Sequence, residues 1–424
     1  MIKIIEYNIS KREEIFDVKT VNVNVSSIVS EIIEKVKKQG DKAVLELTER
    51  FDKAKLTSLR ITEEEIETAY NKVDKGFIEV LKKAYNNVLE YHQKQKREGF
   101  EIVRENGEVI GQKIIPIERA GIYVPGGTAA YPSTVIMDTV PAIVAGCERV
   151  VMVTPPNENG EINPVILASC KIAGVTEIYK VGGAQAIAAL AYGTETIPRV
   201  YKIVGPGNAF VAEAKRQVFG QVSIDMIAGP SEIMVVADDK NRAKDVAADL
   251  LSQAEHDKMA SAVLVTNSLE FAKKVSDEIE KQIPSLLRAD IARYSIDNNG
   301  KIIVTSDLDS AIDVANEIAP EHLELCLDNP FEYLKRIKNA GSVFLGRYCP
   351  EALGDYLAGA NHTLPTSGTA KFSSALSVDD FIKKTQYVYY DKNALEKVAY
   401  DIDTFAKKEG LTAHAKSAVI RFED

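Results

Sequence analysis

The sequence is poor in cysteine, and its cysteines are not arranged as in a disulfide framework or a zinc ribbon. Its four cysteines are Cys147, Cys170, Cys326 and Cys349, and no two of them form a CxxC pair. The polar start, MIKIIEYNISKREE, lacks the apolar segment of a secretory signal. We therefore expect a reduced, cytoplasmic protein, and we assign no catalytic role to Cys147 or Cys349.

The sequence also lacks a long uninterrupted hydrophobic run and a cluster of positive charge. Its most apolar region, AAYPSTVIMDTVPAIVAGC, is interrupted by Asp138 and by two prolines, so no transmembrane helix is expected. A net charge of -10 without a stripe of lysine and arginine disfavours nucleic-acid binding, which requires phosphate charge to be neutralised. Small molecules or a second copy of the chain are the expected partners.

What the sequence does contain is a repeated α/β pattern. Up to about residue 115, charged amphipathic stretches such as SSIVSEIIEKVKKQGDKAVLELTERF predict helices. From Arg119, short apolar strands that end in glycine or proline alternate with helices, as in GIYVPGG, VVMVTPP and IYKVGGAQ. A second set, including IMVVADD, SAVLVT and KIIVTS, follows the segment AGPSE. This alternation is typical of parallel, doubly wound sheets.

The changes in pattern predict one domain inserted into another, because 424 residues exceed what one core usually supports. We expect residues 119–231 to form the inserted α/β domain. Residues 21–118, with the helical lead-in, and residues 232–378 would form the discontinuous first α/β domain. Residues 1–20 would be an N-terminal arm. Residues 379–424 are too few for a core of their own, so we expect a tail that docks on a partner subunit.

Three glycine-rich turns follow expected strands, in GIYVPGGTAAYPS, KVGGAQA and IVGPGNAF. Ligands of open α/β sheets bind at the carboxyl ends of strands, and the last two turns run into helix N-termini that favour anions. None of the three matches GxGxxG. They could hold a dinucleotide pyrophosphate or be ordinary turns between strand and helix.

Histidines beside acids and amides are the main candidates for chemistry. In LLSQAEHDKMA, Gln253 and His256 fall together beside the apolar stripe of a helix, so they could be two metal ligands or two unrelated surface side chains. In IAPEHLEL, Glu321 and His322 lie at a helix-to-strand junction where a short loop would expose both. They could act as water activator and base, or form an ordinary surface pair.

The other histidines are less informative. Asp355 and His362 lie in the loop-rich segment LGDYLAGANHTLPTSGTA, whose length is typical of a functional loop. His414 lies in the tail and His92 in a charged helix, where both are expected to be solvated. Asp, Gln and His side chains together would suit zinc, but their wide spacing does not establish such a site.

Eight motifs in a fixed order resemble the histidinol dehydrogenase family. They are AGIYVPGGTAAYPSTVIM, VGGAQAIAALAYGT, VGPGNAFVAEAKR, AGPSEI, LLSQAEHD, APEHLEL, GDYLAGANHTLPT and EGLTAHA. The resemblance runs from about Ile115 to the C-terminus. It implies a zinc-dependent homodimer that oxidises L-histidinol to L-histidine with two NAD+ through a bound aldehyde. The fold that it implies is two incomplete Rossmann-like doubly wound domains, with small terminal segments forming a swapped dimer.

The resemblance also implies roles for individual residues. One zinc ion per subunit would be held by Gln253, His256, Asp355 and His414, with His414 supplied across the dimer interface. His322 would take the alcohol proton as hydride leaves, and Glu321 would activate the water that attacks the aldehyde. The zinc ligands and this pair would all contact the substrate.

Further positions match contacts to cofactor and substrate in the family. Tyr123, Gln185 and Asn208 would lie near NAD+, while Ser231, His362 and Glu409 would contact the substrate. Three alternatives remain open. They are an NAD-linked dehydrogenase of another amino alcohol, a zinc hydrolase that needs no NAD+, and a dimeric binding protein without activity, which the Glu321–His322 pair disfavours.

Overall fold

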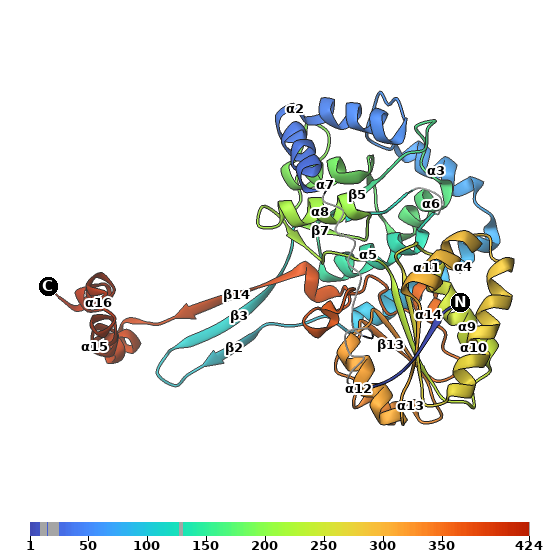
Figure 1. Cartoon of the computed structure of the whole chain (residues 1–424). Helices are drawn as coiled ribbons and strands as arrows, with labels where there is room; N and C mark the ends of the chain where they lie inside the picture. Colours follow the sequence, from blue (N-terminus) through green and yellow to red (C-terminus); the bar gives the residue numbers. More distant parts are fainter. Residues whose placement is uncertain (9–14, 16–24, 127–129, 424) are drawn as a thin grey trace. The chain divides into compact units, whose positions relative to one another are not determined.

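The computed structural model describes residues 1–8, 15, 25–126 and 130–423 (Figure 1). The chain divides into two compact units. The first comprises residues 1–95 and 117–381, and the second comprises residues 96–116 and 382–424. Among the described residues, no helix is both long and apolar enough to cross a membrane.

One parallel sheet of the first unit has five strands in the order β6-β5-β4-β7-β8. Its strands are β4 (Arg119–Tyr123), β5 (Arg149–Thr154), β6 (Glu177–Lys180), β7 (Lys202–Val204) and β8 (Ser223–Ile224). Its connecting helices are α5 (Pro132–Ala145), α6 (Pro164–Ala173), α7 (Gly183–Tyr192) and α8 (Ala209–Val218). The chain adds strands on one side of β4 and then on the other, so the strand order reverses between β4 and β7.

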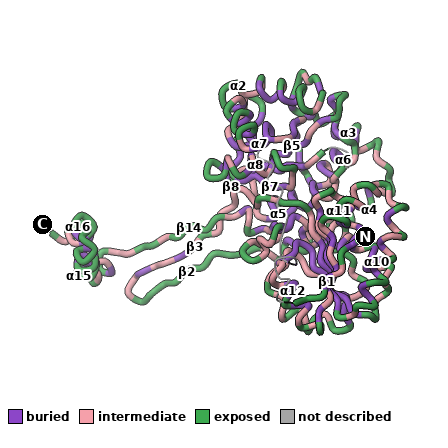
Figure 2. Tube along the Cα trace, viewed as in Figure 1, coloured by how far each residue is buried: buried purple, intermediate pink, exposed green. Residues whose placement is uncertain are grey.

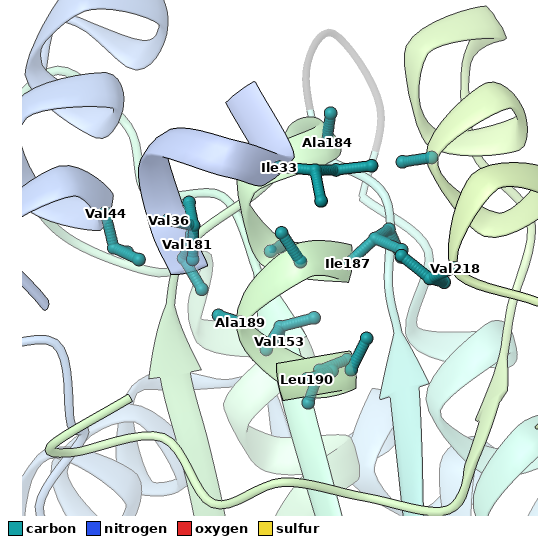
Figure 3. Close-up of a cluster of buried hydrophobic side chains, with 14 of the residues drawn as sticks. Ile33, Val36, Val44, Val153, Val181, Ala184, Ile187, Ala189, Leu190 and Val218 are labelled. Atoms are coloured by element: carbon teal, nitrogen blue, oxygen red, sulfur yellow. The ribbon is translucent and has the colours of Figure 1, made fainter. Parts of the chain in front are cut away.

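Three helices near the N-terminus pack on this five-stranded layer. They are α2 (Ser26–Asp52), α3 (Glu63–Lys72) and α4 (Lys75–Gln93). Helix α2 contacts α7 and α8, helix α3 contacts α6, and helix α4 contacts α5. Figure 3 shows Ile33 and Val36 of α2 in one buried cluster with Ile187 of α7. These helices, expected to join residues 232–378 in one domain, cover the five-stranded sheet instead. An apolar stripe predicts that a helix has a buried face but not which sheet it covers.

The second parallel sheet of this unit has six strands in the order β1-β11-β10-β9-β12-β13. Its strands are β1 (Lys3–Glu6), β9 (Glu232–Ala237), β10 (Ser261–Thr266), β11 (Lys301–Val304), β12 (His322–Cys326) and β13 (Ser342–Leu345). Its helices are α9 (Ala243–Ala254), α10 (Leu269–Gln282), α11 (Ala289–Asn299), α12 (Leu308–Ile318), α13 (Pro330–Leu334) and α14 (Glu351–Tyr356). The first unit also contains the short 3-10 helices η2 (Ile283–Ser285), η3 (Thr369–Lys371) and η4 (Val378–Phe381). The start of the expected N-terminal arm, residues 1–20, contributes an edge strand, β1, and residues 9–14 and 16–20 of that arm lie outside the described residues.

The six-stranded sheet is buried on both faces (Figure 2). Along β9, Ile233 and Val235 belong to one core cluster, while Met234 and Val236 belong to another. Side chains alternate between the two faces of a strand, so a continuous apolar run fills two cores at once. The prediction of an α/β protein with parallel sheets is confirmed. The limits of the inserted domain at 118/119 and 231/232 stay a prediction.

The second unit combines an antiparallel sheet with a pair of helices. The sheet has the order β14-β3-β2 and consists of β2 (Phe100–Val103), β3 (Val109–Pro116) and β14 (Ile382–Tyr389). The helices are α15 (Lys392–Lys408) and α16 (Thr412–Val419), followed by η5 (Ile420–Phe422). The tail expected at 379–424 therefore shares its sheet with residues 100–116, which were expected in the first α/β domain.

Candidate active site

The predicted catalytic pair lies at the start of a central strand. His322 is the first residue of β12 and Glu321 precedes it, and they are only 3% and 8% exposed. The expectation that a short loop would expose both side chains is therefore wrong. Strand β12 is paired with β9 on one side and β13 on the other, so the groups at its start are covered by neighbouring strands and by the segments that follow them.

The imidazole of His322 is held in one tautomer. Its Nδ1 donates to the carbonyl oxygen of Glu232 at 2.9 Å, because a carbonyl can only accept. Its Nε2 is buried and has no hydrogen-bond partner within the described ranges. Burial lowers the pKa of His322, although the charge of Asp355 opposes this. His322 is therefore a neutral imidazole with a free lone pair on Nε2, as a general base requires.

Carboxyl groups surround this imidazole. Glu321 Oε2 accepts from the Glu232 backbone N–H at 2.8 Å, and burial raises the pKa of Glu321 well above its usual range. Burial likewise raises the pKa of Glu232 to about 7 and that of Glu351 to about 8. Negative charge is costly here, so the site favours either protons or a cation beside these groups.

The structure brings three of the predicted zinc ligands to this place. Gln253 lies in the last turn of α9 and is 1% exposed. The helix ends at Ala254, and His256 lies in the turn that follows, where its N–H donates to the Gln253 carbonyl at 3.0 Å. Burial lowers the pKa of His256, and the nearby charge of Asp355 opposes that shift. Asp355 is carried by α14.

Buried donor atoms around Gln253 and Asp355 fit a zinc ion, and they include atoms of His322 and Glu351, which are not among the predicted ligands. The buried Gln253 Oε1, His322 Nε2 and Glu351 Oε1 have no hydrogen-bond partner in the part of the chain that the structure describes. One atom each from His322, Glu351 and Asp355 lie within 4.8 Å of one another. A buried polar atom without a partner costs about 1–3 kcal/mol, and a mixed nitrogen and oxygen set is one that zinc accepts.

The segment after α14 closes the site. His362 Nδ1 lies 3.6 Å from Asp355 Oδ1, and its Nε2 lies 3.4 Å from the Thr134 hydroxyl on α5. Burial alone would lower the pKa of His362, but the contact with Asp355 raises it overall. Ser231 immediately precedes β9 and is half-buried. Since Thr134 belongs to the five-stranded layer, His362 connects the two sheets.

Two of the three predicted NAD+ contacts meet at the N-terminus of α7. The Tyr123 hydroxyl, at the end of β4, accepts from the Gly183 N–H at 3.1 Å, and burial raises the pKa of Tyr123 to about 12. Gln185 is buried in the first turn of α7. Asn208 caps α8, where its Oδ1 accepts from the N–H groups of Phe210 at 3.0 Å and Val211 at 3.2 Å. All three positions lie at the carboxyl edge of the five-stranded sheet.

The catalytic pair lies at the amino edge of the six-stranded sheet. Ser231 and His322 stand at the amino ends of β9 and β12, whereas the rule for open sheets points to carboxyl ends. The carboxyl edge of the six-stranded sheet is instead occupied by Arg347, which pairs with Asp238 at 2.9 Å and Asp328 at 2.7 Å. The candidate site therefore combines the carboxyl edge of one sheet with the amino edge of the other.

Comparisons with known proteins identify the family. A family model for histidinol dehydrogenase matches residues 17–422. The chain belongs to the histidinol dehydrogenase family. It is 56% identical over 402 residues to the histidinol dehydrogenase of Clostridium acetobutylicum, covering 95% of this chain and 93% of the relative. It is 55% identical over 403 residues to that of Listeria monocytogenes, with 95% and 94% covered.

A solved histidinol dehydrogenase has the same fold. The crystal structure from Elizabethkingia anophelis superposes with a TM-score of 0.95 at 38% identity, covering 100% of this chain and 98% of that one. Membership of the histidinol dehydrogenase family confirms the predicted class of activity. The chain is an NAD-dependent oxidoreductase of histidine biosynthesis, with Zn2+ and NAD+ as its cofactors.

Two predicted site residues belong to the second unit. Glu409 directly follows α15 and His414 lies in α16, and both are exposed within that unit. Their roles stay predictions. Sequence reasoning also missed Glu351, although it precedes Asp355 by four residues in CPEALGDY, a spacing that places both on one face of a helix.

Sequence reasoning also missed Asp138, which is fully buried on α5 beneath the His362 segment. The Thr363 hydroxyl donates to Asp138 Oδ1 at 2.6 Å, and Asp138 Oδ2 has no hydrogen-bond partner among the residues described. Burial raises the pKa of Asp138 to about 7, and the neighbouring Thr363 and His362 offset this only in part. The carboxyl is therefore largely protonated below neutral pH.

Asp138→Asn is expected to flatten the pH dependence of stability. An unfolded aspartate titrates near about 3.9, so the folded protein binds the extra proton between about pH 4 and pH 7. The free energy of unfolding of the native protein then falls as pH rises through that window. Each unit of difference between the folded and unfolded pKa is worth about 1.4 kcal/mol, so the total fall is a few kcal/mol. Urea unfolding of native and variant protein at several pH values tests this. Parallel pH profiles would contradict it.

Proposed function

We propose that this chain converts L-histidinol to L-histidine through L-histidinaldehyde, with His322 as the base and Glu321 as the group that activates water. The observation that carries the proposal is the buried Nε2 of a neutral His322, which has no hydrogen-bond partner among the described residues and lies 3.7 Å from Glu351 Oε1 and 3.8 Å from Asp355 Oδ1. A base in this state can accept a proton without first losing one.

In the first oxidation, His322 Nε2 takes the proton of the substrate hydroxyl while the carbinol carbon transfers hydride to NAD+. The bond from His322 Nδ1 to the Glu232 carbonyl orients the ring and stabilises the imidazolium that forms. The burial of the pair keeps bulk water away from the reacting carbon. The product of this step is the aldehyde.

In the second oxidation, the Glu321 carboxylate removes a proton from a water molecule as that water attacks the aldehyde carbon. His322 gives the proton it took in the first step to the former carbonyl oxygen, which completes the hydrate and leaves the imidazole neutral again. The hydrate then loses hydride to a second NAD+ while His322 takes its hydroxyl proton, and the product is the carboxylic acid. Glu321 must be ionised for this role, and a bound cation beside it would favour the ionised form that burial disfavours. The Glu232 N–H that donates to Glu321 fixes the direction of the carboxyl.

Gln253, His256 and Asp355 would hold one zinc ion per subunit, with His414 of the partner subunit as the fourth ligand. When bound, zinc would supply positive charge and orient the substrate. Ser231, His362 and Glu409 would contact the substrate, and Tyr123, Gln185 and Asn208 would contact NAD+. His362 is well placed for this role because it touches both Asp355 and α5.

The second unit would form a swapped homodimer. Tyr400 and Phe405 of α15 and Leu411, which directly precedes α16, are large, apolar and exposed, as expected of side chains that another subunit covers. A dimer of this kind would bring His414 to a site in the other subunit. We also propose a cytoplasmic location, because the four cysteines are free thiols, as in a reducing compartment.

The decisive experiment is the yield of NADH per L-histidinol consumed by the purified protein. We expect a ratio of two, loss of the reaction after a chelator removes the metal, and its return with added zinc. A ratio of one would indicate a simpler dehydrogenase of amino alcohols. Consumption of substrate without NADH would indicate a hydrolase.

A further inference from the structure

A buried ion pair holds the turn between β7 and α8. Lys215 of α8 pairs with Asp225, which follows β8, and their side chains are only 2% and 1% exposed. Lys215 Nζ donates to the Gly205 carbonyl at 3.0 Å. Asp225 Oδ2 accepts from the Gly205 N–H at 2.8 Å. Both backbone groups of one glycine are therefore bound by the two members of the pair.

The turn itself lies tightly against the end of β4. Gly205 has a φ of +116°, and a Cβ at this position would lie 2.1 Å from the Tyr123 carbonyl oxygen. Only glycine fits there. From Gly205 the chain runs through Pro206 and Gly207 to Asn208, which caps α8. The position of Gly205 therefore sets where Asn208 and the first N–H groups of α8 lie.

A buried ion pair is a poor choice for stability alone. Removing two charges from water costs about as much as their attraction returns, and an apolar pair of similar volume is often as stable or more so. Lys215 also stands on the apolar face of α8 beside Val211, Ala214 and Val218, which are buried. A leucine or methionine would fill that position more simply. What an apolar pair could not do is bind both the N–H and the carbonyl of Gly205.

We propose that Lys215 and Asp225 are positioning residues that fix the Gly205–Asn208 turn so that Asn208 and the N-terminus of α8 meet the nucleotide. This inference rests on the proposed function, in which NAD+ lies beside Asn208. Neither side chain reaches the reacting atoms. Their effect is to present a preformed turn, which lowers the ordering cost of binding NAD+.

The test is a pair of variants that separates positioning from stability. Lys215→Met leaves the Asp225 carboxylate buried without its partner, so we expect a lower Tm and a KM for NAD+ raised about tenfold or more. The double variant Lys215→Met with Asp225→Leu removes both charges, so we expect Tm to recover. The KM for NAD+ and the Kd of NADH, measured by calorimetry, should stay raised about tenfold, with the KM for histidinol within twofold of native.

Arg216→Gln is the matched control. Arg216 is the next residue of α8, but it is exposed and pairs with Glu213 at the surface, so its loss should leave Tm and both KM values unchanged. If the double variant does not fold, Asp225→Asn decides. It keeps the size of the side chain but replaces one of the two acceptor oxygens with an NH2 group, so either the contact to Lys215 or that to the Gly205 N–H is lost. It must also raise the KM for NAD+ selectively.

Two results are distinguishable. If the native protein forms no NADH from histidinol, the proposed function fails. If the native protein does so and the double variant combines a recovered Tm with a native KM for NAD+, the ion pair is only structural and this inference is overturned. In the fallback variant, a native KM for NAD+ has the same meaning.

Discussion

His322→Asn is expected to lower turnover by about 100- to 10,000-fold, the usual contribution of a positioned general base. Asparagine is shorter and still offers an N–H to the Glu232 carbonyl, but it cannot take up a proton. Because His322 is not among the predicted zinc ligands, zinc content should remain at one ion per subunit. Steady-state rates and metal analysis of the same preparation test both statements.

His92→Asn provides a matched control for the loss of a buried imidazole. His92 is fully buried, and its Nδ1 donates to the Val88 carbonyl at 2.8 Å, as Nδ1 of His322 does to the Glu232 carbonyl. Its Nε2 differs, because it accepts from Asn361 Nδ2 at 3.3 Å. This variant should lose stability but keep its turnover per folded molecule. Turnover near the native value in His322→Asn would remove His322 as the base, and loss of zinc would make it a ligand instead.

The alternation of strands and helices could be predicted because it depends on the local spacing of apolar residues along the chain. Runs such as IMVVADD and SAVLVT become β9 and β10, buried on both faces as parallel strands are. Local periodicity does not specify partners that are distant in the chain. Hence the helices α2 to α4 were placed on the wrong layer, and the antiparallel pairing of β3 with β14 went unpredicted. His92 was expected to be solvated because its neighbours are charged, but it faces the apolar side of α4.

The candidate site was predictable as a set of residues only through resemblance. Spacing alone leaves open whether Gln253 and His256 are two metal ligands or two unrelated side chains, since Asp355, the third predicted ligand of this subunit, lies on another element. The burial of Glu321 and His322 was not predicted for the same reason. The strands that cover His322 are distant from it in the sequence. Lys215 did carry a local signal, a lysine within the apolar stripe of α8, but its partner Asp225 becomes adjacent only when β7 and β8 pair.

Glu321→Gln is expected to separate the two oxidations. The amide oxygen can still accept from the Glu232 N–H, but the side chain can no longer remove a proton from water. The first hydride transfer, which uses His322, should continue, while attack of water on the aldehyde should slow by about 100- to 10,000-fold. In a single turnover, NADH per histidinol should fall from two towards one, and the aldehyde should become detectable by a carbonyl trap.

Histidinaldehyde supplied as substrate makes this prediction sharper. With NAD+, the Glu321→Gln enzyme should oxidise it poorly, whereas with NADH it should reduce it to histidinol at a near-native rate, because reduction needs no water. Glu232→Gln is the control, since Glu232 is a neighbouring carboxyl whose side chain instead accepts from the Ser367 N–H at 3.1 Å. It should keep the ratio of two. If Glu321→Gln also keeps that ratio and Glu232→Gln or Glu351→Gln loses it, the water is activated by another carboxyl of the same buried group.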